Sequence, residues 1–424
     1  MFDIADRQVM GMRPSGGEWY IGIEIGNRWT QVSCYYPGLE EPEAKSTVAG
    51  TEIYRIPTAL CRHKKTGIWH FGEEANRLAE VGEGVYVDYL MARALKQEEI
   101  LLDQEYRAVD LFQIFLRKVI RMALPKGGIQ AVTTFTFTLK AVTDEIVDLL
   151  RYISKNLGIA DDQLTIQDYR ESFYAFAVCQ EPELWQYDVA LFSYNGDEIW
   201  QKRLSFFRNT KPKVATVEER CLGRLPEEVG GWDAAFAQLV RKALAGKIVS
   251  TVYLIGSGFE GGWMKESLQA VCQGRRAFQG KSLYTKGACY SGALESRLEE
   301  SETVYFCEYK RKEHILIKVS YGDKEEFFPL VEAGSNRHQV EKEFRMILEG
   351  EAAIDLWVYP LGEQEPRHKR LELTGLKVSG SRRCRLFVSL YRGGGDRLLL
   401  KVQDIGWGEI QPGTGLEWEY EISS

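Results

Sequence analysis

The hydrophobic positions of this chain follow one pattern up to about residue 300 and a different one beyond it. In the first part, β-branched and aromatic runs alternate with segments whose apolar residues recur at i, i+3 and i+4, which is typical of strands and amphipathic helices. The first run, residues 19–36, is interrupted by Gly26-Asn27-Arg28, which predicts two strands joined by a tight turn. Helical spacing predicts helices over residues 109–124 and 140–157, the second ending at Gly158.

The other periodic segments continue this alternation. Strands are predicted at residues 54–59, 67–71, 130–138, 165–169, 187–192, 199–207 and 250–255. Helices are predicted at residues 71–80, 232–244, 263–272 and 286–299. Strands and helices in this order predict an α/β fold.

Beyond residue 302 the pattern is one of short strands separated by turns, at residues 314–321, 326–331, 352–359, 369–376, 383–391 and 397–405. Such a series predicts an all-β sandwich over residues 300–424. Four aromatic residues alternate along its strands: Trp357, Tyr359, Phe387 and Tyr391. We expect them in its core, and the alternative is that some of them line a peptide groove. Residues 1–17 have no periodic pattern and are predicted to be a flexible leader.

Composition narrows the class of protein. The 424 residues contain 54 Lys and Arg against 61 Asp and Glu, a net charge of −7 that argues against a surface built for nucleic acid or anionic lipid. No long uncharged apolar run predicts a membrane span, and we expect a cytoplasmic protein. Eight cysteines without a C-x-x-C pair and five histidines predict reduced thiols and no metal site.

Several segments, taken in order, resemble the nucleotide-contacting motifs of the actin-like ATPase superfamily, in particular its DnaK-type heat-shock chaperones. They are residues 21–30, 170–178, 187–200, 252–268 and 285–293. The amino-acid sequences of these and nearby segments also resemble those of a group of DnaK-like proteins from Gram-positive bacteria for which no activity is established. The resemblance implies a two-lobed actin-like (ribonuclease-H-like) fold, with lobes at residues 18–184 and 185–299, followed by a chaperone-type substrate-binding sandwich. It also implies ATP or ADP with Mg²⁺ as cofactor.

The first phosphate loop of that family corresponds to Glu24, Gly26, Asn27 and Arg28. Glu24 stands where the family has Asp and is able to hold Mg²⁺ through water, while Gly26 permits close approach of the backbone to phosphate. Asn27 and Arg28 replace a pair of hydroxyl residues. We expect Arg28 either to bind phosphate or to occupy its space by pairing with Glu24 or Asp197.

The second phosphate loop departs further from the family. Ser193 replaces the metal-side Asp, and Asn195-Gly196 retains the hairpin turn, in which both residues tolerate positive φ. Only one of three glycines is kept, and Asp197 adds negative charge where a triphosphate would lie. We therefore expect nucleotide binding to be weak or absent.

Two further motifs complete the resemblance. Glu171 corresponds to the carboxylate that positions the attacking water. Gly256, Ser257 and Gly258 correspond to the adenosine loop, with a following helix aimed at the site. Such a turn is also common in α/β proteins that bind no nucleotide, so both interpretations stay open. Residues 205–231 are too few for the family's full adenine-clamping subdomain.

The leading hypothesis is a DnaK-like protein with a degenerate nucleotide site that serves as a binding or assembly module, with Arg28 partly replacing nucleotide and the β domain holding a polypeptide partner. The alternative is a slow Mg²⁺-dependent ATPase chaperone in which Glu24, Glu171 and Ser193 arrange metal and water. A filament-forming actin relative is a third hypothesis. The sequence does not decide the oligomeric state. It also leaves open whether the protein binds ATP or ADP with Mg²⁺ or has no cofactor. No segment corresponds to a chaperone's helical lid, so we do not expect tight client capture.

Overall fold

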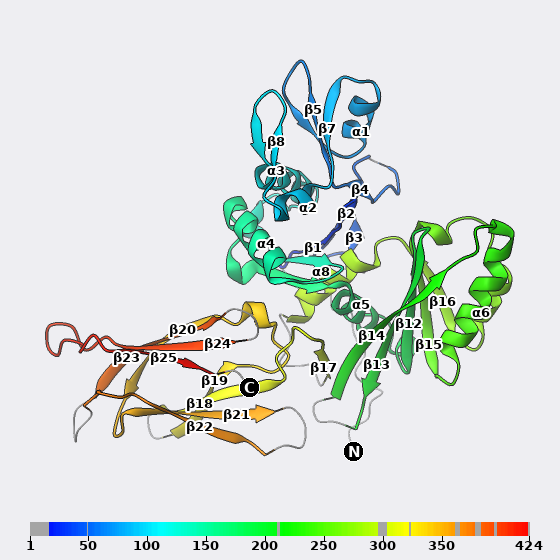
Figure 1. Cartoon of the computed structure of the whole chain (residues 1–424). Helices are drawn as coiled ribbons and strands as arrows, with labels where there is room; N and C mark the ends of the chain where they lie inside the picture. The colour runs from blue at the N-terminus through cyan, green and yellow to red at the C-terminus, as the bar shows by residue number, and fades with distance from the viewer. Residues whose placement is uncertain are drawn as a thin grey trace. The chain divides into compact units, whose positions relative to one another are not determined.

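The computed structural model describes residues 17–48, 50–209, 213–295, 303–321, 324–360, 365–377, 383–393 and 397–422. The chain divides into two compact units, Met1–Tyr305 and Phe306–Ser424 (Figure 1). Except for Gly17, the predicted leader lies outside the described residues, and so does the predicted boundary between residues 299 and 300. The structure confirms the α/β class, with several sheets.

The first unit contains a six-stranded sheet in the order β11-β10-β1-β2-β3, with β4 pairing with β2. Its strands are β1 (Tyr20–Ile25), β2 (Trp29–Tyr35), β3 (Glu43–Ala44), β4 (Ile56–Pro57), β10 (Thr134–Leu139) and β11 (Leu164–Asp168). Strands β1 and β2 form the predicted antiparallel hairpin, whereas β10 runs parallel to β1 and β11 parallel to β10. The carboxyl ends of β1, β10 and β11 therefore lie at one edge of the sheet.

A second six-stranded sheet repeats this arrangement in the order β16-β15-β12-β13-β14-β17. Its strands are β12 (Asp188–Tyr194), β13 (Glu198–Phe207), β14 (Lys213–Arg224), β15 (Val249–Ile255), β16 (Arg276–Gly280) and β17 (Thr303–Phe306). Strands β12 and β13 form an antiparallel hairpin, and β15 and β16 continue parallel to β12. In each sheet the first strand lies where the strand order reverses. Ligand sites of α/β proteins lie at the carboxyl ends of strands beside such points.

Helices cover both sheets (Figure 1). Helices α3 (Ala108–Arg121) and α4 (Asp144–Leu157) share the hydrophobic core of the first sheet. Helices α6 (Trp232–Leu244) and α7 (Glu266–Cys272) share the core of the second. Helix α5 (Tyr169–Val178) packs against α8 (Leu283–Glu295), and a cluster of Tyr20, Tyr35, Ala175 and Cys289 joins this pair to the first sheet.

Helix α8 follows strands β12 to β16 of the second sheet in the chain but packs on the first sheet. A Cβ atom on Gly22 of β1 would lie 2.1 Å from the carbonyl oxygen of Thr285, so only glycine permits this approach. The hydroxyls of Ser33 and Thr285 hydrogen-bond at 2.7 Å, and the Ser282 hydroxyl donates to Gln31 at 2.9 Å. The predicted division at residues 184 and 185 therefore assigns α8 to the lobe that it does not cover.

The rest of the first unit consists of smaller elements inserted after β4. Strands β5 (Leu60–His63), β6 (Trp69–His70) and β7 (Gly84–Val87) form a three-stranded sheet that packs against α1 (Gly72–Glu80). Helix α2 (Leu90–Leu95) and the hairpin of β8 (Glu99–Leu101) and β9 (Glu105–Arg107) lead into α3.

The second unit contains two four-stranded antiparallel sheets that share one hydrophobic core. The first, in the order β19-β18-β21-β22, consists of β18 (Glu313–Tyr321), β19 (Lys324–Val331), β21 (Ala353–Pro360) and β22 (Arg367–Glu372). The second, in the order β20-β23-β24-β25, consists of β20 (Lys342–Leu348), β23 (Cys384–Arg392), β24 (Leu398–Asp404) and β25 (Glu417–Glu421).

The prediction that four aromatic residues fill this core is wrong. Along β21, Leu356 and Val358 are buried while Trp357 and Tyr359 are partly exposed. Strand β23 likewise buries its aliphatic residues and leaves Phe387 and Tyr391 partly exposed. Aliphatic and aromatic residues alternate with the same period of two, and the aliphatic set occupies the inner face.

Most predicted elements form at or near their predicted positions. Helix α6 has the predicted bounds, and the Gly158 cap of α4 has a φ of +84°. Helix α7 begins at Glu266 rather than at residue 263. Strands β14, β16, β17, β20 and β25 and the short strands β3, β5, β7, β8 and β9 were not predicted. The end of the predicted helix 286–299, beyond residue 295, lies outside the described residues. Among the described residues, no helix combines the length and apolar character needed to cross a membrane.

Candidate functional site

A cavity of about 300 Å³ lies between the two sheets of the first unit, where strands β1, β12 and β15 end. Five of the predicted site residues line it: Glu24, Ser193, Asn195, Asp197 and Gly256. The topology brings them together because each lies at or just after the carboxyl end of a strand beside a point where the strand order reverses.

Arg28 does not take part in this site. Its side chain is exposed at the β1–β2 turn and forms no ion pair with any residue that the structure describes. Asp197 pairs instead with Arg224, with Oδ1 and Nη2 3.1 Å apart, and Glu24 accepts a hydrogen bond from the Tyr169 hydroxyl. The predicted pairing of Arg28 with Glu24 or Asp197 is therefore wrong.

The backbone of the β1–β2 turn is already engaged within the protein. The Gly26 N–H donates to the Trp29 carbonyl at 2.9 Å, and the Thr58 hydroxyl donates to the Gly26 carbonyl at 2.8 Å. The Thr58 N–H donates to the Arg28 carbonyl at 2.9 Å, and Asn27 is exposed. A phosphate cradle requires free N–H groups, and the Gly26 N–H is not free, so this turn has fewer groups for binding phosphate than the sequence predicts.

Glu171 is 5% exposed and does not line the cavity. Helix α5 begins with Asp168 as its cap, whose carboxylate accepts the N–H groups of Arg170 and Glu171, both at 2.9 Å. The residue of α5 that reaches the cavity is Tyr169. A group that positions water must face the reacting atoms, so the predicted role of Glu171 has no support in this arrangement.

The glycines of the predicted adenosine loop lie against Tyr194 of the neighbouring hairpin. Gly256 has a φ of +107°, and a Cβ atom there would lie 2.2 Å from the Tyr194 carbonyl oxygen. A Cβ atom on Gly258 would lie 2.2 Å from the Tyr194 ring. The loop is thus shaped to fit the β12–β13 hairpin, in whose turn Gly196 has a positive φ but Asn195 does not.

The helix expected to aim its N-terminus at the cavity is capped by a carboxylate. Asp233 accepts the backbone N–H groups of Lys265, Glu266 and Ser267 at 3.0, 2.8 and 2.8 Å. Desolvation acts in the opposite direction, but the hydrogen bonds from Ser267, Glu266 and Lys265 lower the pKa of Asp233. The first N–H groups of α7 are therefore not free for a ligand.

Arg55, which the sequence did not single out, spans the cavity. Its guanidinium donates to the Asn195 amide oxygen at 2.8 Å and to the Ser257 hydroxyl at 3.2 Å. Arg55 belongs to the segment before β4 of the first sheet, while Asn195 and Ser257 follow strands of the second. Arg55 thus links the two sheets at the positions that the resemblance assigns to phosphate and adenosine.

Lys202 of β13 is the second cation that sequence reasoning missed. It is 3% exposed, and its Nζ lies 2.6 Å from Oε1 of Glu219 on β14. Its ammonium also lies over the rings of Tyr169 and Tyr284, 5.9 and 5.5 Å from their centroids. These two rings stack on each other at 4.1 Å with an interplanar angle of 5°.

The electrostatics of this cluster follow from its burial. Desolvation raises the pKa of Glu24, although the hydrogen bond from Tyr169 and the charges of Arg55 and Lys202 act in the opposite direction. Desolvation also raises the pKa values of Tyr169 and Tyr284. For Lys202, desolvation would lower the pKa, but the interactions with Tyr284 and Glu219 outweigh it and raise the pKa. Both tyrosines are therefore neutral and Lys202 is charged at neutral pH.

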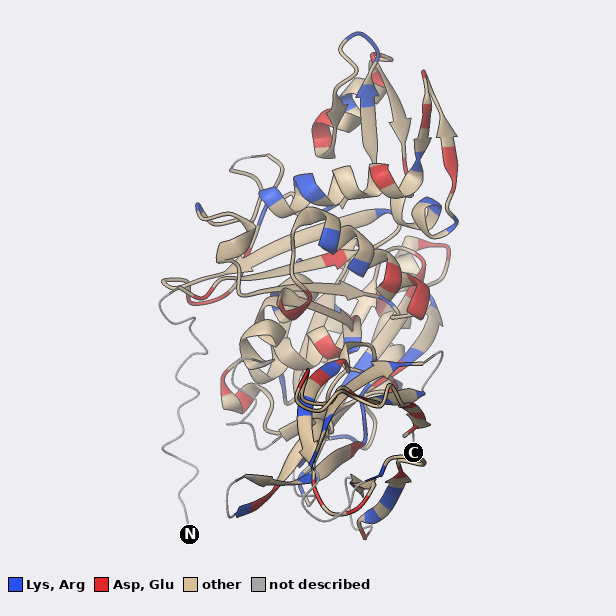
Figure 2. Ribbon diagram, turned by 90° about the vertical axis from the view of Figure 1, so that its left-hand side faces the viewer, with Lys and Arg blue, Asp and Glu red and all other residues tan. Residues whose placement is uncertain are grey.

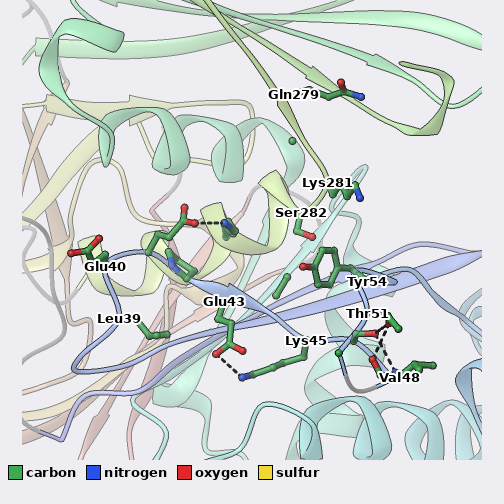
Figure 3. Close-up of a pocket in the computed structure, with 17 residues that line it drawn as sticks. Leu39, Glu40, Glu43, Lys45, Val48, Thr51, Tyr54, Gln279, Lys281 and Ser282 are labelled. Carbon is green, nitrogen blue, oxygen red and sulfur yellow. Dashed lines mark hydrogen bonds and ion pairs between the residues drawn. The ribbon is translucent and has the colours of Figure 1, made fainter. Parts of the chain in front are cut away.

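A larger cavity of about 740 Å³ lies beyond the end of β16, between residues 279–286 and the segment that contains β3 (Figure 3). Its charged groups are paired: Lys45 with Glu43 at 2.8 Å, and Lys286 with Glu41 at 3.0 Å. In neither cavity nor elsewhere in the described parts of the chain do three or more His, Cys, Asp or Glu side chains converge as metal ligands would.

Comparison with known families places this architecture among proteins of unknown function. Residues 41–308 match the C-terminal part of the DUF5716 family, and the chain belongs to that family. Residues 310–424 match a domain of unknown function, DUF8552. The two matches meet close to the boundary between the two units. No curated protein matches the sequence.

Proposed function

We propose that the first unit is an actin-like (ribonuclease-H-like) two-lobed fold and that the protein is a DnaK-like binding or assembly module with weak or no ATP hydrolysis. Two observations support the fold: a sheet topology that occurs twice, and sequence motifs in the order typical of the superfamily. The cavity at the strand ends corresponds to the nucleotide cleft of that fold.

The observation that carries the reduced nucleotide binding is that two of the four basic residues lining the cavity, Lys202 and Arg55, are engaged within the protein. Lys202 is bound to Glu219 and lies over stacked rings, and Arg55 is hydrogen-bonded to Asn195 and Ser257. A triphosphate would have to displace these contacts while approaching Asp197 and Glu198. The cavity of about 300 Å³ is also at the lower end of the range typical of ligand pockets, roughly 300–1,000 Å³.

We further propose that the second unit holds a polypeptide partner on a sheet face. Phe327, Trp357 and Tyr359 form an aromatic group on the outer face of its first sheet, with ring centroids 6.1–6.2 Å apart. Phe327 is 45% exposed, and exposed aromatic groups are common at protein-binding surfaces. A cytoplasmic location stays a prediction.

Calorimetric titration of the full chain with Mg-ATP and with Mg-ADP tests the proposal. We expect no measurable binding at micromolar nucleotide for the wild type or for Arg28→Ala, a matched control because Arg28 is exposed and outside the cavity. Arg55→Ala removes a cation from a cavity that also contains Glu24, Asp197 and Glu198, so it is likewise expected not to bind nucleotide.

The slow ATPase hypothesis predicts the opposite outcome. It requires micromolar binding by the wild type together with phosphate release that Glu24→Gln abolishes, because Glu24 would arrange the metal. That pair of results would refute a degenerate site. Concentration-dependent light scattering in the presence of nucleotide would support the filament hypothesis instead.

A further inference from the structure

Strand β16 is the terminal strand of the second sheet, and its outer edge is open. Its backbone pairs with β15 alone, and apart from that ladder it makes no backbone hydrogen bond to another described residue. Arg276, Phe278 and Gln279 on this strand are exposed. An open edge offers N–H and C=O groups to an extended chain, which is the basis of strand addition.

Cavities lie at the end of this edge. One of about 250 Å³ is lined by the apolar residues Phe176, Leu184, Tyr253 and Phe278 together with polar and charged residues that include Glu41, Lys281 and Lys286. The larger cavity of about 740 Å³ begins at the same place, and Figure 3 shows Gln279, Lys281 and Ser282 across from Glu43 and Tyr54. A chain paired with β16 would therefore have an apolar pocket for one side chain and open space for the residues that follow.

The charge of this edge differs from that of the whole protein. Residues 267–282 contain no Asp or Glu and place Arg275, Arg276 and Lys281 on or beside β16, although the chain carries a net charge of −7, while Lys286 on α8 is paired with Glu41. Elsewhere the two signs are interspersed along the ribbon (Figure 2). The ion pairs of Arg276 with Glu181 at 3.7 Å and of Lys281 with Glu52 at 2.8 Å are exposed. Exposed pairs are worth little, so a ligand carboxylate exchanges with them at small cost.

We propose that the β16 edge is a docking strand for an extended acidic segment of a partner protein, which adds to the second sheet and inserts one apolar side chain beside Phe278. The backbone pairing supplies affinity, the pocket lined by Phe176, Tyr253 and Phe278 selects the apolar residue, and the basic residues select carboxylates on either side of it. This surface does not depend on nucleotide binding.

Two fluorescein-labelled heptapeptides test this proposal by fluorescence anisotropy on the full chain without nucleotide. Glu-Val-Glu-Phe-Glu-Val-Glu is expected to bind with micromolar affinity and Lys-Val-Lys-Phe-Lys-Val-Lys at least tenfold more weakly. Arg276→Glu is expected to weaken the acidic peptide about fivefold, and Phe278→Ser about tenfold. Lys247→Glu is the matched control, because Lys247 is an exposed lysine outside these cavities, and it should leave the affinity unchanged.

Hydrogen exchange shows where the peptide binds. The acidic peptide should slow the amide exchange of residues 276–280, a result that a nonspecific charge effect would not give. Absence of binding at 1 mM peptide, equal affinity for both peptides, or unchanged affinity in both variants would overturn the proposal. So would competition by single-stranded oligothymidylate at lower concentration than the acidic peptide, which would assign the edge to nucleic acid.

Discussion

Replacing Lys202 with methionine removes the buried ammonium from the cavity and keeps a side chain of similar length. Lys202 is 3% exposed, and its Nζ lies 2.6 Å from the Glu219 carboxylate and above the rings of Tyr169 and Tyr284. The substitution leaves Glu219 without its cation and removes the cation–π contacts. We expect Lys202→Met to destabilise the first unit.

The magnitude follows from the environment of the two partners. Removing one partner of a fully buried pair costs about 3–5 kcal/mol. The Glu219 side chain is 24% exposed, so water solvates its carboxylate in the variant and reduces this penalty. The loss of the cation–π contacts adds about 1 kcal/mol. We therefore expect a destabilisation of about 2–3 kcal/mol, which for a unit of this size lowers Tm by roughly 5 °C.

Urea unfolding of the full chain, followed by tryptophan fluorescence, measures this change. The double variant Lys202→Met/Glu219→Gln is expected to recover about 1–2 kcal/mol, because it no longer leaves an unpaired carboxylate. Lys242→Met is the control, since Lys242 is exposed on α6 and forms no ion pair with a described residue. A single variant within about 0.5 kcal/mol of the wild type, or strict additivity in the double variant, would contradict the inferred role of the pair.

Three other substitutions test separate parts of the site. Glu24→Gln should raise Tm at pH 7, because burial raises the pKa of Glu24 above its usual 4.5 and its ionisation opposes folding; the gain should shrink as the pH falls toward 4.5 in a thermal-shift series. Gly256→Ala should lower the free energy of unfolding in urea by roughly 3 kcal/mol or more, because its Cβ would lie 2.2 Å from the Tyr194 carbonyl oxygen at a φ of +107°. Gly262→Ala is the control and should be nearly neutral, because the space around Gly262 is open. Asp233→Ala should cost about 1 kcal/mol at pH 7 through loss of the α7 cap. Because hydrogen bonds hold the Asp233 pKa below its usual value of 3.8, this difference should shrink progressively as the pH falls below 3.8, and a difference that grows on acidification would disprove the capping argument.

The sequence predicted most of the fold because its central elements have strong periodic patterns. Helix α6 and the β1–β2 and β12–β13 hairpins combine apolar periodicity with turn residues. Strand β14 escaped prediction because its second half, Glu218–Arg224, is mostly exposed, and pairing with β13 decides its conformation. The inner face of β21 was assigned wrongly because alternation gives two faces without saying which one is buried.

The candidate site was only partly predictable. Glu24, Ser193 and Gly256 reach the cavity because motif and strand position agree. Arg55 lies in a segment predicted as a strand, residues 54–59, but belongs to no motif, and its hydrogen bonds to Asn195 and Ser257 depend on how two distant parts of the chain pack. The charge at Arg28 was visible in the sequence, but the direction in which a turn presents a side chain was not.

The return of helix α8 to the first sheet has a consequence for synthesis on the ribosome. The hydrogen bond between Ser33 and Thr285 joins residues 252 positions apart. Chains are synthesised at roughly 5–20 residues per second, so helix α8 is made about 10–50 s after the β1–β2 hairpin. During that interval the face of β1 that carries Gly22 is exposed to solvent or to whatever binds nascent chains. Fragments that end before residue 283 should therefore remain incompletely folded and be degraded rapidly.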